Sequence, residues 1–191
     1  MRTWMAVSKA LCVLCVVALA QVTLPTAGHA ATAQAINASA DQTIALFRQQ
    51  VPGADAYLRD ARGVLIFPQV IQAGIGIGGE YGEGVMRIAD HDAAYYSIAA
   101  GSFGFQFGAQ AKSIVVLFMD GQALRHFQEK TAMDNNFNVG IDGSITIINV
   151  GGQASVNSAT INRPIIGFVF NQKGLMYNLS LQGAKVTQIQ R

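Results

Sequence analysis

Glu80 and Glu83 are the residues of this chain whose type and spacing come nearest to acid–base chemistry. Glycoside hydrolysis needs two carboxyl groups across a sugar-sized gap, one of them with a raised pKa. The run from Glu80 to Gly84 mixes the two glutamates with glycine, a composition that suits turn geometry well. We therefore expect a structural role for the pair, and a hydrolase that uses Glu80 or Glu83 is the weaker alternative.

A metal site would have to use His91, the histidine between Asp90 and Asp92. Zinc sites usually draw on more nitrogen or sulfur ligands than this triplet supplies. The same triplet is typical of a solvated hairpin tip, so the sequence predicts a turn here and no metal. His126, beside Arg125 in a predicted helix, is expected to be a surface residue.

The spacing of three glycines fits a nucleotide-binding motif, but the residues that follow them argue against a nucleotide site. Gly74, Gly76 and Gly79 fit G-x-G-x-x-G, but in a dinucleotide site that motif must open a helix whose N-terminus meets the pyrophosphate. The residues that follow, Glu80 to Gly84, cannot open a good helix. No serine lies in the G-x-S-x-G pattern of a hydrolase nucleophile. The sequence therefore predicts a protein that is not an enzyme and has no cofactor.

The first thirty residues have the pattern of a secretory signal peptide. Arg2 and Lys9 give a positive start, residues 10–20 are apolar, and small residues stand first and third before a cut after Ala30. The apolar run is short for a membrane-spanning helix, which needs roughly 20 residues. We predict a signal peptide at 1–30 and a mature chain exported to the periplasm or cell envelope.

Both cysteines, Cys12 and Cys15, lie inside the predicted signal peptide. A lipid-modified cysteine needs a small residue before it and a full apolar region upstream, whereas Leu11 and Leu14 precede these two. A lipid anchor is therefore not expected. The mature chain would contain no cysteine for disulfide or thiol chemistry.

The net charge argues against nucleic acid as a partner. Without Arg2 and Lys9, the 13 basic residues become 11, which balance the 11 acidic residues of the mature chain. A neutral chain without a basic run lacks the electrostatic footprint of a nucleic-acid-binding protein. The same balance predicts only weak long-range attraction to anionic membranes.

Strands that contain glycine form the centre of the chain. Within 74–79 and 102–108 a period of two, with Ile or Phe at alternate positions, predicts strands. Glycine inside a strand usually marks a bulge, a bend or the close approach of another backbone. We therefore expect a strongly coiled sheet. Valine in place of Gly78 or Gly79 should cost more than about 1 kcal/mol if the backbone there is bent or has positive φ.

Helices and buried strands surround this glycine block. Residues 31–38 are expected to be a flexible leader, and Ser39 to begin a helix that Pro52 ends. Further helices are predicted at 54–60 and from Asp120 to about Lys130, with one helical turn at 69–72. Strands are predicted at 63–67, 80–89, 93–99, 113–119, 139–147, 164–170 and 175–182, and a bulge or corner at 151–152.

These elements define a fold class. The runs 113–119 and 164–170 are apolar at every position or nearly so, which is typical of strands buried on both faces. The sequence predicts a single α+β domain at 39–191, with a Gly-rich, mainly antiparallel sheet curled into a barrel-like or sandwich core. N-terminal helices and one inserted helix should pack against that sheet.

The glycine block and the motifs on either side of it resemble the SYLF domain family, found in lipid- and actin-associated endocytic proteins and in exported bacterial proteins often labelled lipoproteins. The similarity extends over nearly the whole mature chain and rests on spaced glycine, aromatic and aliphatic residues. They are Phe67, Pro68, Ala73, Gly74, Gly78, Gly79, Gly82, Gly84, the run from Gly104 to Gln110 that includes Gly108, Gly174, Leu175, Met176, Leu181 and Gly183.

The resemblance implies a module that binds phosphoinositides or other anionic lipids, with an N-terminal amphipathic helix as its membrane-contacting part. In this sequence that helix is 40–51, with Ile44, Phe47 and Val51 as its apolar face and Arg48 as its one basic residue. Interfacial helices usually carry several basic residues. Bacterial phospholipids are the expected ligands, because an exported bacterial protein meets phosphoinositides and actin only if it is delivered to a host.

A second interpretation keeps the same fold without a lipid ligand. The protein would then be a structural or protein-interaction module of the envelope, and the N-terminal helix would be a lid over the sheet. Burial of Ile44 and Phe47 in the folded chain would favour this interpretation. The oligomeric state is not predicted.

Overall fold

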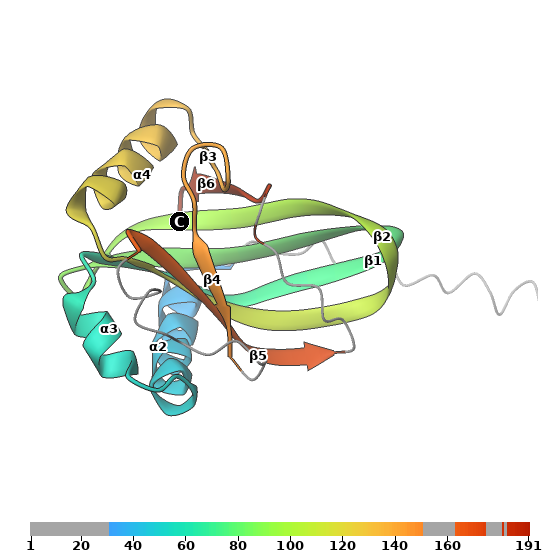
Figure 1. The fold of residues 1–191 in the computed structure, drawn as a ribbon, viewed down its shortest axis with the longest axis horizontal. Helices are drawn as coiled ribbons and strands as arrows, with labels where there is room; N and C mark the ends of the chain where they lie inside the picture. The colour runs from blue at the N-terminus through green and yellow to red at the C-terminus, as the bar shows by residue number, and fades with distance from the viewer. Residues whose placement is uncertain (1–30, 151–162, 175–180, 182) are drawn as a thin grey trace, which may run out of the picture. The chain divides into compact units, whose positions relative to one another are not determined.

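One long hairpin, made of strands β1 and β2, is the centre of the fold (Figure 1). The computed structural model describes residues 31–150, 163–174, 181 and 183–191, without the side chains of 75–76 and 102–107. Residues 31–191 form one compact unit. The described elements are α2 (Ala33–Gln50), α3 (Ala54–Asp60), β1 (Gly63–Ile88), β2 (His91–Phe118), α4 (Gly121–Met133), β3 (Phe137–Asn138), β4 (Thr146–Asn149), β5 (Ile165–Gly174) and β6 (Lys185–Ile189).

The two long strands pair antiparallel from Gly63 opposite Phe118 to Ile88 opposite His91. Ala89 and Asp90 connect them with φ values of 51° and 63°, the left-handed conformation that tight hairpin turns require. The predicted hairpin tip at 90–92 is thus confirmed, although the turn begins one residue earlier.

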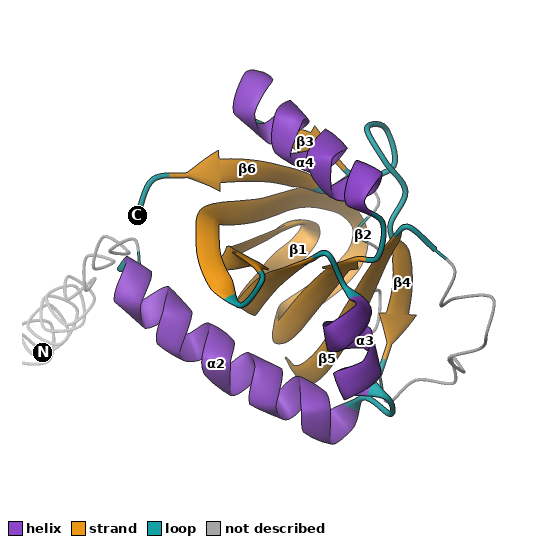
Figure 2. Ribbon diagram, turned by 90° about the vertical axis from the view of Figure 1, so that its left-hand side faces the viewer, coloured by secondary structure: helices purple, strands orange, loops and turns teal. Residues whose placement is uncertain are grey.

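β1 turns back on itself between Gly74 and Gly78. A Cβ atom added at Gly74 would touch the Cα of Gly78 and would lie 2.7 Å from the carbonyl oxygen of Ile77. Farther along, a Cβ at Gly82 would lie 2.7 Å from the carbonyl oxygen of Gln69. The two halves of this one strand therefore face each other, and β1 and β2 appear as nested curves in Figure 2.

The other strands attach to β2. β5 pairs antiparallel with the second half of β2, β6 pairs antiparallel with its first half, and β4 runs parallel to the outer side of β5. The sheet order is β3-β6-β2-β5-β4, with β1 paired to β2. The predicted α+β class, with a mainly antiparallel sheet curled into a barrel-like core, is confirmed.

Both faces of the central strands are buried. On β2, Ile114 and Val116 point into the curl, in a cluster that α4 covers through Phe127, whereas Val115 and Leu117 point outward into a second cluster under α2 and α3. Figure 2 shows α2 and α4 on opposite sides of the curled strands. The predicted double burial of the apolar runs 113–119 and 164–170 is confirmed.

Two predictions about helical structure were wrong. The first helix begins at Ala33, where Thr32 caps it by accepting a hydrogen bond from the Ala35 N–H (3.2 Å), so residues 33–38 are helical and are not a flexible leader. The turn of helix predicted at 69–72 is part of β1. The helices at 54–60 and after Asp120 are confirmed.

Two strand boundaries also differ. β1 continues through Pro68, because a register shift between Phe67 and Val70 lifts the proline out of the ladder. The predicted strand at 139–147 is mostly a turn, and only its last residues enter β4. The bulge predicted at 151–152 and most of the strand predicted at 175–182 lie outside the described residues.

The glycines differ sharply in what surrounds them. A Cβ at Gly84 would collide with the Ile66 carbonyl oxygen, and Gly108 has φ +133°, which side chains rarely adopt. Gly79 has no such constraint, since its Cβ would lie 3.6 Å from its nearest neighbour, the Ala100 carbonyl oxygen. The cost predicted for valine at Gly79 is therefore not expected. Gly104 lies among residues 102–107, whose surroundings are outside the description.

Alanine at Gly84 should lower the free energy of unfolding by about 1–3 kcal/mol, because the added methyl group must force two backbone segments apart. Gly79→Ala in the same strand is the matched control and should change it by less than about 0.5 kcal/mol. Urea unfolding of both variants measures the difference. Equal stability of the two variants would show that the halves of β1 do not approach as closely as described.

Candidate functional site

The residues predicted to contact lipid lie on α2, and most of them are used inside the fold. Phe47 is 0% exposed and packs against Phe168 and Phe170, with ring centroids 5.1 and 5.6 Å apart. Val51 is also buried, and Ile44 is half-buried against the same cluster. In this structure α2 is a lid, and its apolar face is not available to a membrane.

Polar contacts hold the same helix to the hairpin. The Arg87 guanidinium forms ion pairs of 2.8 Å with Asp41 of α2 and with Asp92 of β2. The Asn37 amide donates to the Tyr95 hydroxyl over 3.0 Å. Partial burial is the largest single influence on the pKa of Arg87 and acts to lower it. The hydrogen bonds of Arg87 to Asp92 and Asp41 outweigh burial and raise that pKa. The helix is therefore anchored at its N-terminal half as well as through Phe47.

The two glutamates do not form a two-carboxylate site. Residues three apart in a strand point to opposite faces, and Glu80 points into the curl while Glu83 lies on the outer face. The Glu80 carboxylate pairs with the Lys112 ammonium at 2.6 Å, and their side chains are 6% and 1% exposed. Glu80 Oε1 has no hydrogen-bond partner among the described residues, whereas both carboxylate oxygens of Glu83 accept from Arg191. No substrate can reach this buried pair from solvent.

Glu83 belongs to a separate cluster at the outer surface. It accepts hydrogen bonds from the Tyr81 hydroxyl (2.8 Å) and from the Arg191 guanidinium (2.5 Å). Partial burial acts to raise the pKa of Glu83, but the hydrogen bonds from Arg191 and Tyr81 outweigh it and hold that pKa below its usual value. A carboxyl group kept ionised in this way is unsuited to act as a general acid.

The candidate metal triplet at the hairpin turn is also divided. Asp92 is paired with Arg87, and Asp90 occupies the turn with positive φ. Among the described residues, no group of three or more His, Cys, Asp or Glu side chains is placed to hold a metal ion. No helix within the described residues is long and apolar enough to cross a membrane.

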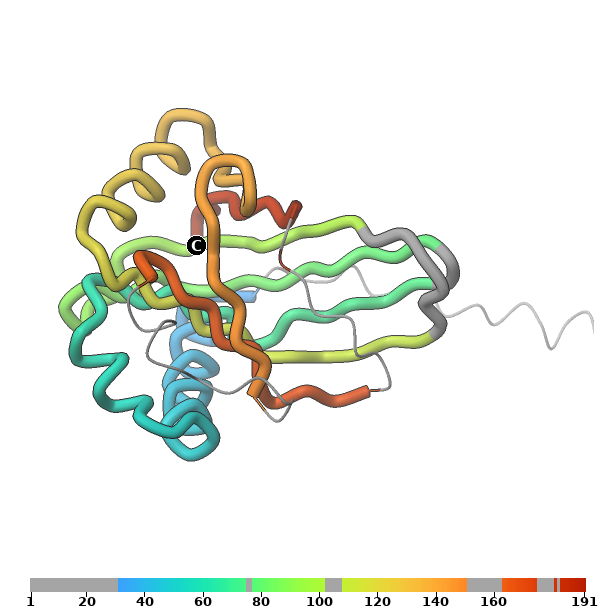
Figure 3. Tube along the Cα trace, in the orientation of Figure 1, coloured from blue at the N-terminus to red at the C-terminus, as the bar shows by residue number. Residues whose placement is uncertain are grey.

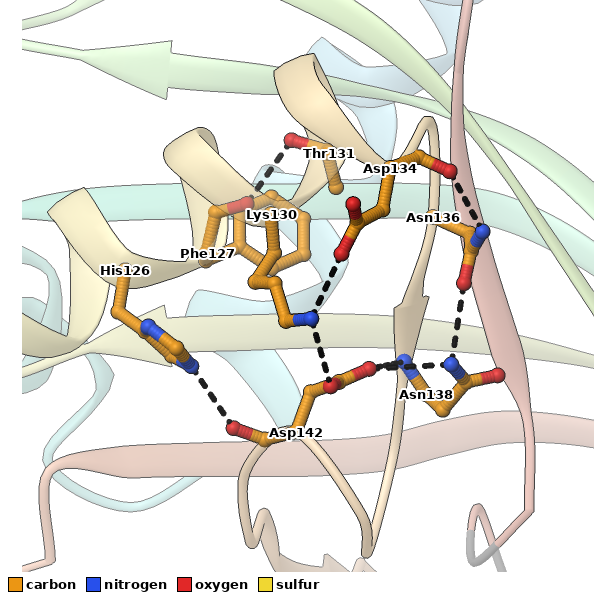
Figure 4. Close-up of polar contacts among 8 residues, drawn as sticks. All are labelled: His126, Phe127, Lys130, Thr131, Asp134, Asn136, Asn138 and Asp142. Atoms are coloured by element: carbon orange, nitrogen blue, oxygen red, sulfur yellow. Dashed lines mark hydrogen bonds and ion pairs between the residues drawn. The ribbon is translucent and has the colours of Figure 1, made fainter.

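His126 is part of a polar network that fastens α4 to the loop after β3 (Figure 4). Its Nε2 lies 3.0 Å from the Asp142 carbonyl oxygen, and the Lys130 ammonium pairs with Asp134 (2.7 Å) and Asp142 (3.3 Å). Hydrogen bonds from the Asn138 backbone and side chain lower the pKa of Asp142. The network is internally satisfied, which indicates a structural role for this exposed loop.

An uncovered surface at the bent end of the hairpin was missed by the sequence analysis. We call it the hairpin end; its exposed large side chains are Ile71, Ile77 and Tyr81, which are 51%, 69% and 52% exposed. In Figures 1 and 3 this end projects away from the three helices. No Asp, Glu, Lys, Arg or His occurs in residues 63–79 or 93–111, and the parts of these runs that pair with each other, 71–79 and 101–111, form this end. Those two charge-free runs are the signal that the sequence did contain.

A groove of about 280 Å³ opens between α2 and the sheet, next to the hairpin end. Its wall on α2 includes Ser39 and Gln42, and its sheet side includes Pro68 of β1, Asn171 of β5 and Lys173 of β5. The lining mixes amide, hydroxyl and apolar groups. None of the described residues that line it is acidic.

The fold and these surfaces define an α+β domain with a buried polar interior, a charge-free hairpin end and an adjoining groove. Residues 99–191 match the model of the Ysc84 family, described as Las17-binding protein actin regulator. The SYLF family predicted from the sequence is thereby confirmed by a match over residues 99–191, and Ysc84 (SYLF) is a family of binding domains. The β1 glycines precede the matched range. No curated protein sequence matches the chain significantly.

Proposed function

We propose that this protein is a non-enzymatic module that binds anionic phospholipid surfaces in the cell envelope through its hairpin end. The observation that carries the proposal is the exposure of Ile71 and Ile77 in a charge-free run of β1, with Tyr81 exposed just beyond it, on a part of the sheet that no described helix covers. Contiguous exposed apolar surface is often an interaction site. The lipid- and actin-binding character of the Ysc84 family supports lipid as the partner.

Positive charge borders one side of the hairpin end. Tyr81, Ala99 and Lys185 are in register across β1, β2 and β6, so their side chains share one face. All three are exposed. A tyrosine and a lysine on one face suit a membrane interface, where the ring lies at headgroup level and the ammonium reaches lipid phosphates.

The other outer face repeats the arrangement. Ile71, Ala111 and Lys173 are in register across β1, β2 and β5. Among ion pairs between described residues, none involves Lys173 or Lys185. The hairpin end is thus apolar with a free lysine on each side, which complements an anionic bilayer approached end-on.

Co-sedimentation with vesicles tests the proposal. Residues 31–191 should sediment with vesicles that contain phosphatidylglycerol, and Ile77→Asp should weaken this binding tenfold or more. Burying an isoleucine side chain contributes about 1.5–3 kcal/mol, and tenfold corresponds to about 1.4 kcal/mol. The predicted signal peptide is omitted because its apolar run would bind lipid by itself.

Ile141→Asp is the matched control, because Ile141 is an equally large side chain, 83% exposed, in the loop after β3. Its binding should equal that of the unchanged protein. If vesicles never bind, or if both variants lose binding equally, the hairpin end is not a lipid-binding surface. The burial of Phe47 then favours the second candidate, a structural or protein-interaction module with α2 as a lid.

A further inference from the structure

We propose that the groove between α2 and the sheet receives the phosphate-bearing headgroup of an anionic phospholipid, while the acyl chains lie over Ile71. This inference rests on the proposed function and adds the part of the lipid that is recognised and the residues that recognise it. It is carried by the charge, the shape and the position of the groove.

The charge of the groove is positive. Two lysines line it, but the Lys112 ammonium is turned into the curl, where it pairs with Glu80 at 2.6 Å. Lys173 is exposed and forms no ion pair with another described residue. With no acidic residue in the lining, its ammonium is left to pair with an anion, and a phosphate supplies several strong acceptor oxygens.

Two irregularities in neighbouring strands shape the groove. β1 shifts register between Phe67 and Val70, and β5 shifts opposite Ala111 and Ser113, so both strands that flank β2 are irregular at the same level. β-Bulges are over-represented next to functional sites, where they re-aim side chains. The regular pleat is therefore interrupted at this level, where Pro68, Ser113 and Asn171 line the groove.

Hydrogen bonds between the strands hold the sheet side of the groove in place without a ligand. Asn171 has φ +51°, and its amide donates to the Ser113 hydroxyl over 3.2 Å. That hydroxyl in turn donates to the Pro68 carbonyl oxygen over 2.8 Å. The bonds join β5, β2 and β1, so Lys173, two residues after Asn171, projects from a fixed backbone. A preorganised site avoids part of the ordering cost of binding.

Size and position select a headgroup rather than a whole lipid. Pockets for drug-sized ligands have volumes of about 300–1,000 Å³, and this groove has about 280 Å³. Lys173 and Ile71 lie on either side of Ala111 in one cross-strand row. A phosphate held by Lys173 would therefore keep its glycerol and acyl chains next to an exposed apolar side chain, at the edge of the hairpin end.

Filling the groove should abolish this recognition. Ser39 is exposed on α2 and lines the groove, so Ser39→Phe places a ring in it without disturbing the core. Binding of residues 31–191 to phosphatidylglycerol vesicles should fall tenfold or more. Ala38→Phe, one residue away and outside the lining, is the matched control and should bind within twofold of the unchanged protein. Equal binding by the two variants would overturn the inference.

Two variants that each remove one lysine charge distinguish binding in the groove from general electrostatic attraction to the membrane. Lys173→Gln and Lys185→Gln remove one positive charge each, so a purely electrostatic contact predicts equal losses of about fivefold. The headgroup site predicts a loss of tenfold or more for Lys173→Gln and a smaller one for Lys185→Gln. Equal losses would contradict the site while leaving the proposed function standing, whereas failure of the unchanged protein to bind would remove both.

Soluble glycerol 3-phosphate distinguishes the two sources of the phosphate. Without acyl chains it lacks the contact with Ile71, so its affinity, measured by calorimetry, should be at least tenfold lower than the affinity for phosphatidylglycerol in vesicles. An equal or higher affinity would assign the groove to a soluble phosphate ester and overturn the lipid assignment.

Discussion

Replacing Phe47 by alanine should lower the free energy of unfolding by about 3–5 kcal/mol, the range for deleting a buried phenylalanine ring. The ring is 0% exposed and contacts Phe168 and Phe170 edge-on or tilted. Aromatic pairs of this kind add about 0.5–1.5 kcal/mol each beyond area burial. Phe47 joins α2 to β5, so its loss should loosen the helix and the sheet together.

Urea unfolding of residues 31–191 measures this effect, and Arg48→Ala provides the matched control. Arg48 is the next residue of α2, and its ion pair with Asp55 is exposed (3.0 Å), so the change should cost less than about 1 kcal/mol. A Phe47→Ala protein that keeps its stability but no longer sediments with vesicles would return the membrane role to α2.

The fate of Phe47 shows what sequence alone could and could not determine about α2. A helix with Ile44, Phe47 and Val51 on one face has the same pattern whether that face meets a sheet or a bilayer. The deciding partners, Phe168 and Phe170, are about 120 positions away in the sequence, and no local pattern connects them to the helix. The helix itself was predictable, but its partner was not.

Local signals were sufficient where one residue determines a boundary. Asp120 accepts a hydrogen bond from the Ala123 N–H over 3.1 Å and begins α4 as predicted. At α2, Thr32 and Ser39 are both acceptable caps, and the sequence analysis chose the wrong one. Ala33 to Ala38 contains good helix formers, so the earlier cap extends the helix at little cost.

The glycine pattern predicted close backbone approach, but not which glycines make it. Gly82 and Gly84 face the first half of their own strand, whereas Gly79, on the other face, is open. The alternation of faces follows from the strand period, but the fold of β1 onto itself is a long-range event. The hairpin end is uncovered for the same reason, because its exposure depends on where the sheet bends and where the helices end.

The second large expected effect concerns the Lys112–Glu80 ion pair, which lies inside the bent hairpin. In an unbent hairpin Lys112 and Glu80 would lie far apart. Lys112 pairs with Val70, and Glu80, which pairs with Ala100, is ten residues farther along β1 than Val70. Folding of the hairpin brings the two charges within 2.6 Å. A buried Gln72–Gln110 hydrogen bond of 2.8 Å lies in the same interior. The Lys112–Glu80 ion pair therefore forms only when the hairpin folds back on itself.

Lys112→Met should destabilise the domain by about 3–5 kcal/mol, because it leaves the Glu80 carboxylate buried without its counter-ion. The double variant with Glu80→Leu should recover most of that loss, since replacing both partners of a buried ion pair by apolar residues is often neutral or stabilising. Urea unfolding of the two single variants and the double variant gives the coupling energy.

A large coupling would establish that the two halves of β1 close around this pair in solution, which the hairpin end requires in order to present Ile71 and Tyr81 on its outer faces. If Lys112→Met instead costs less than about 1 kcal/mol, the carboxylate must reach water. The interior of the curl would then be open, and Glu80 would again be accessible to a ligand. Vesicle binding by the double variant adds the functional readout: it should persist, because neither side chain is exposed at the surface.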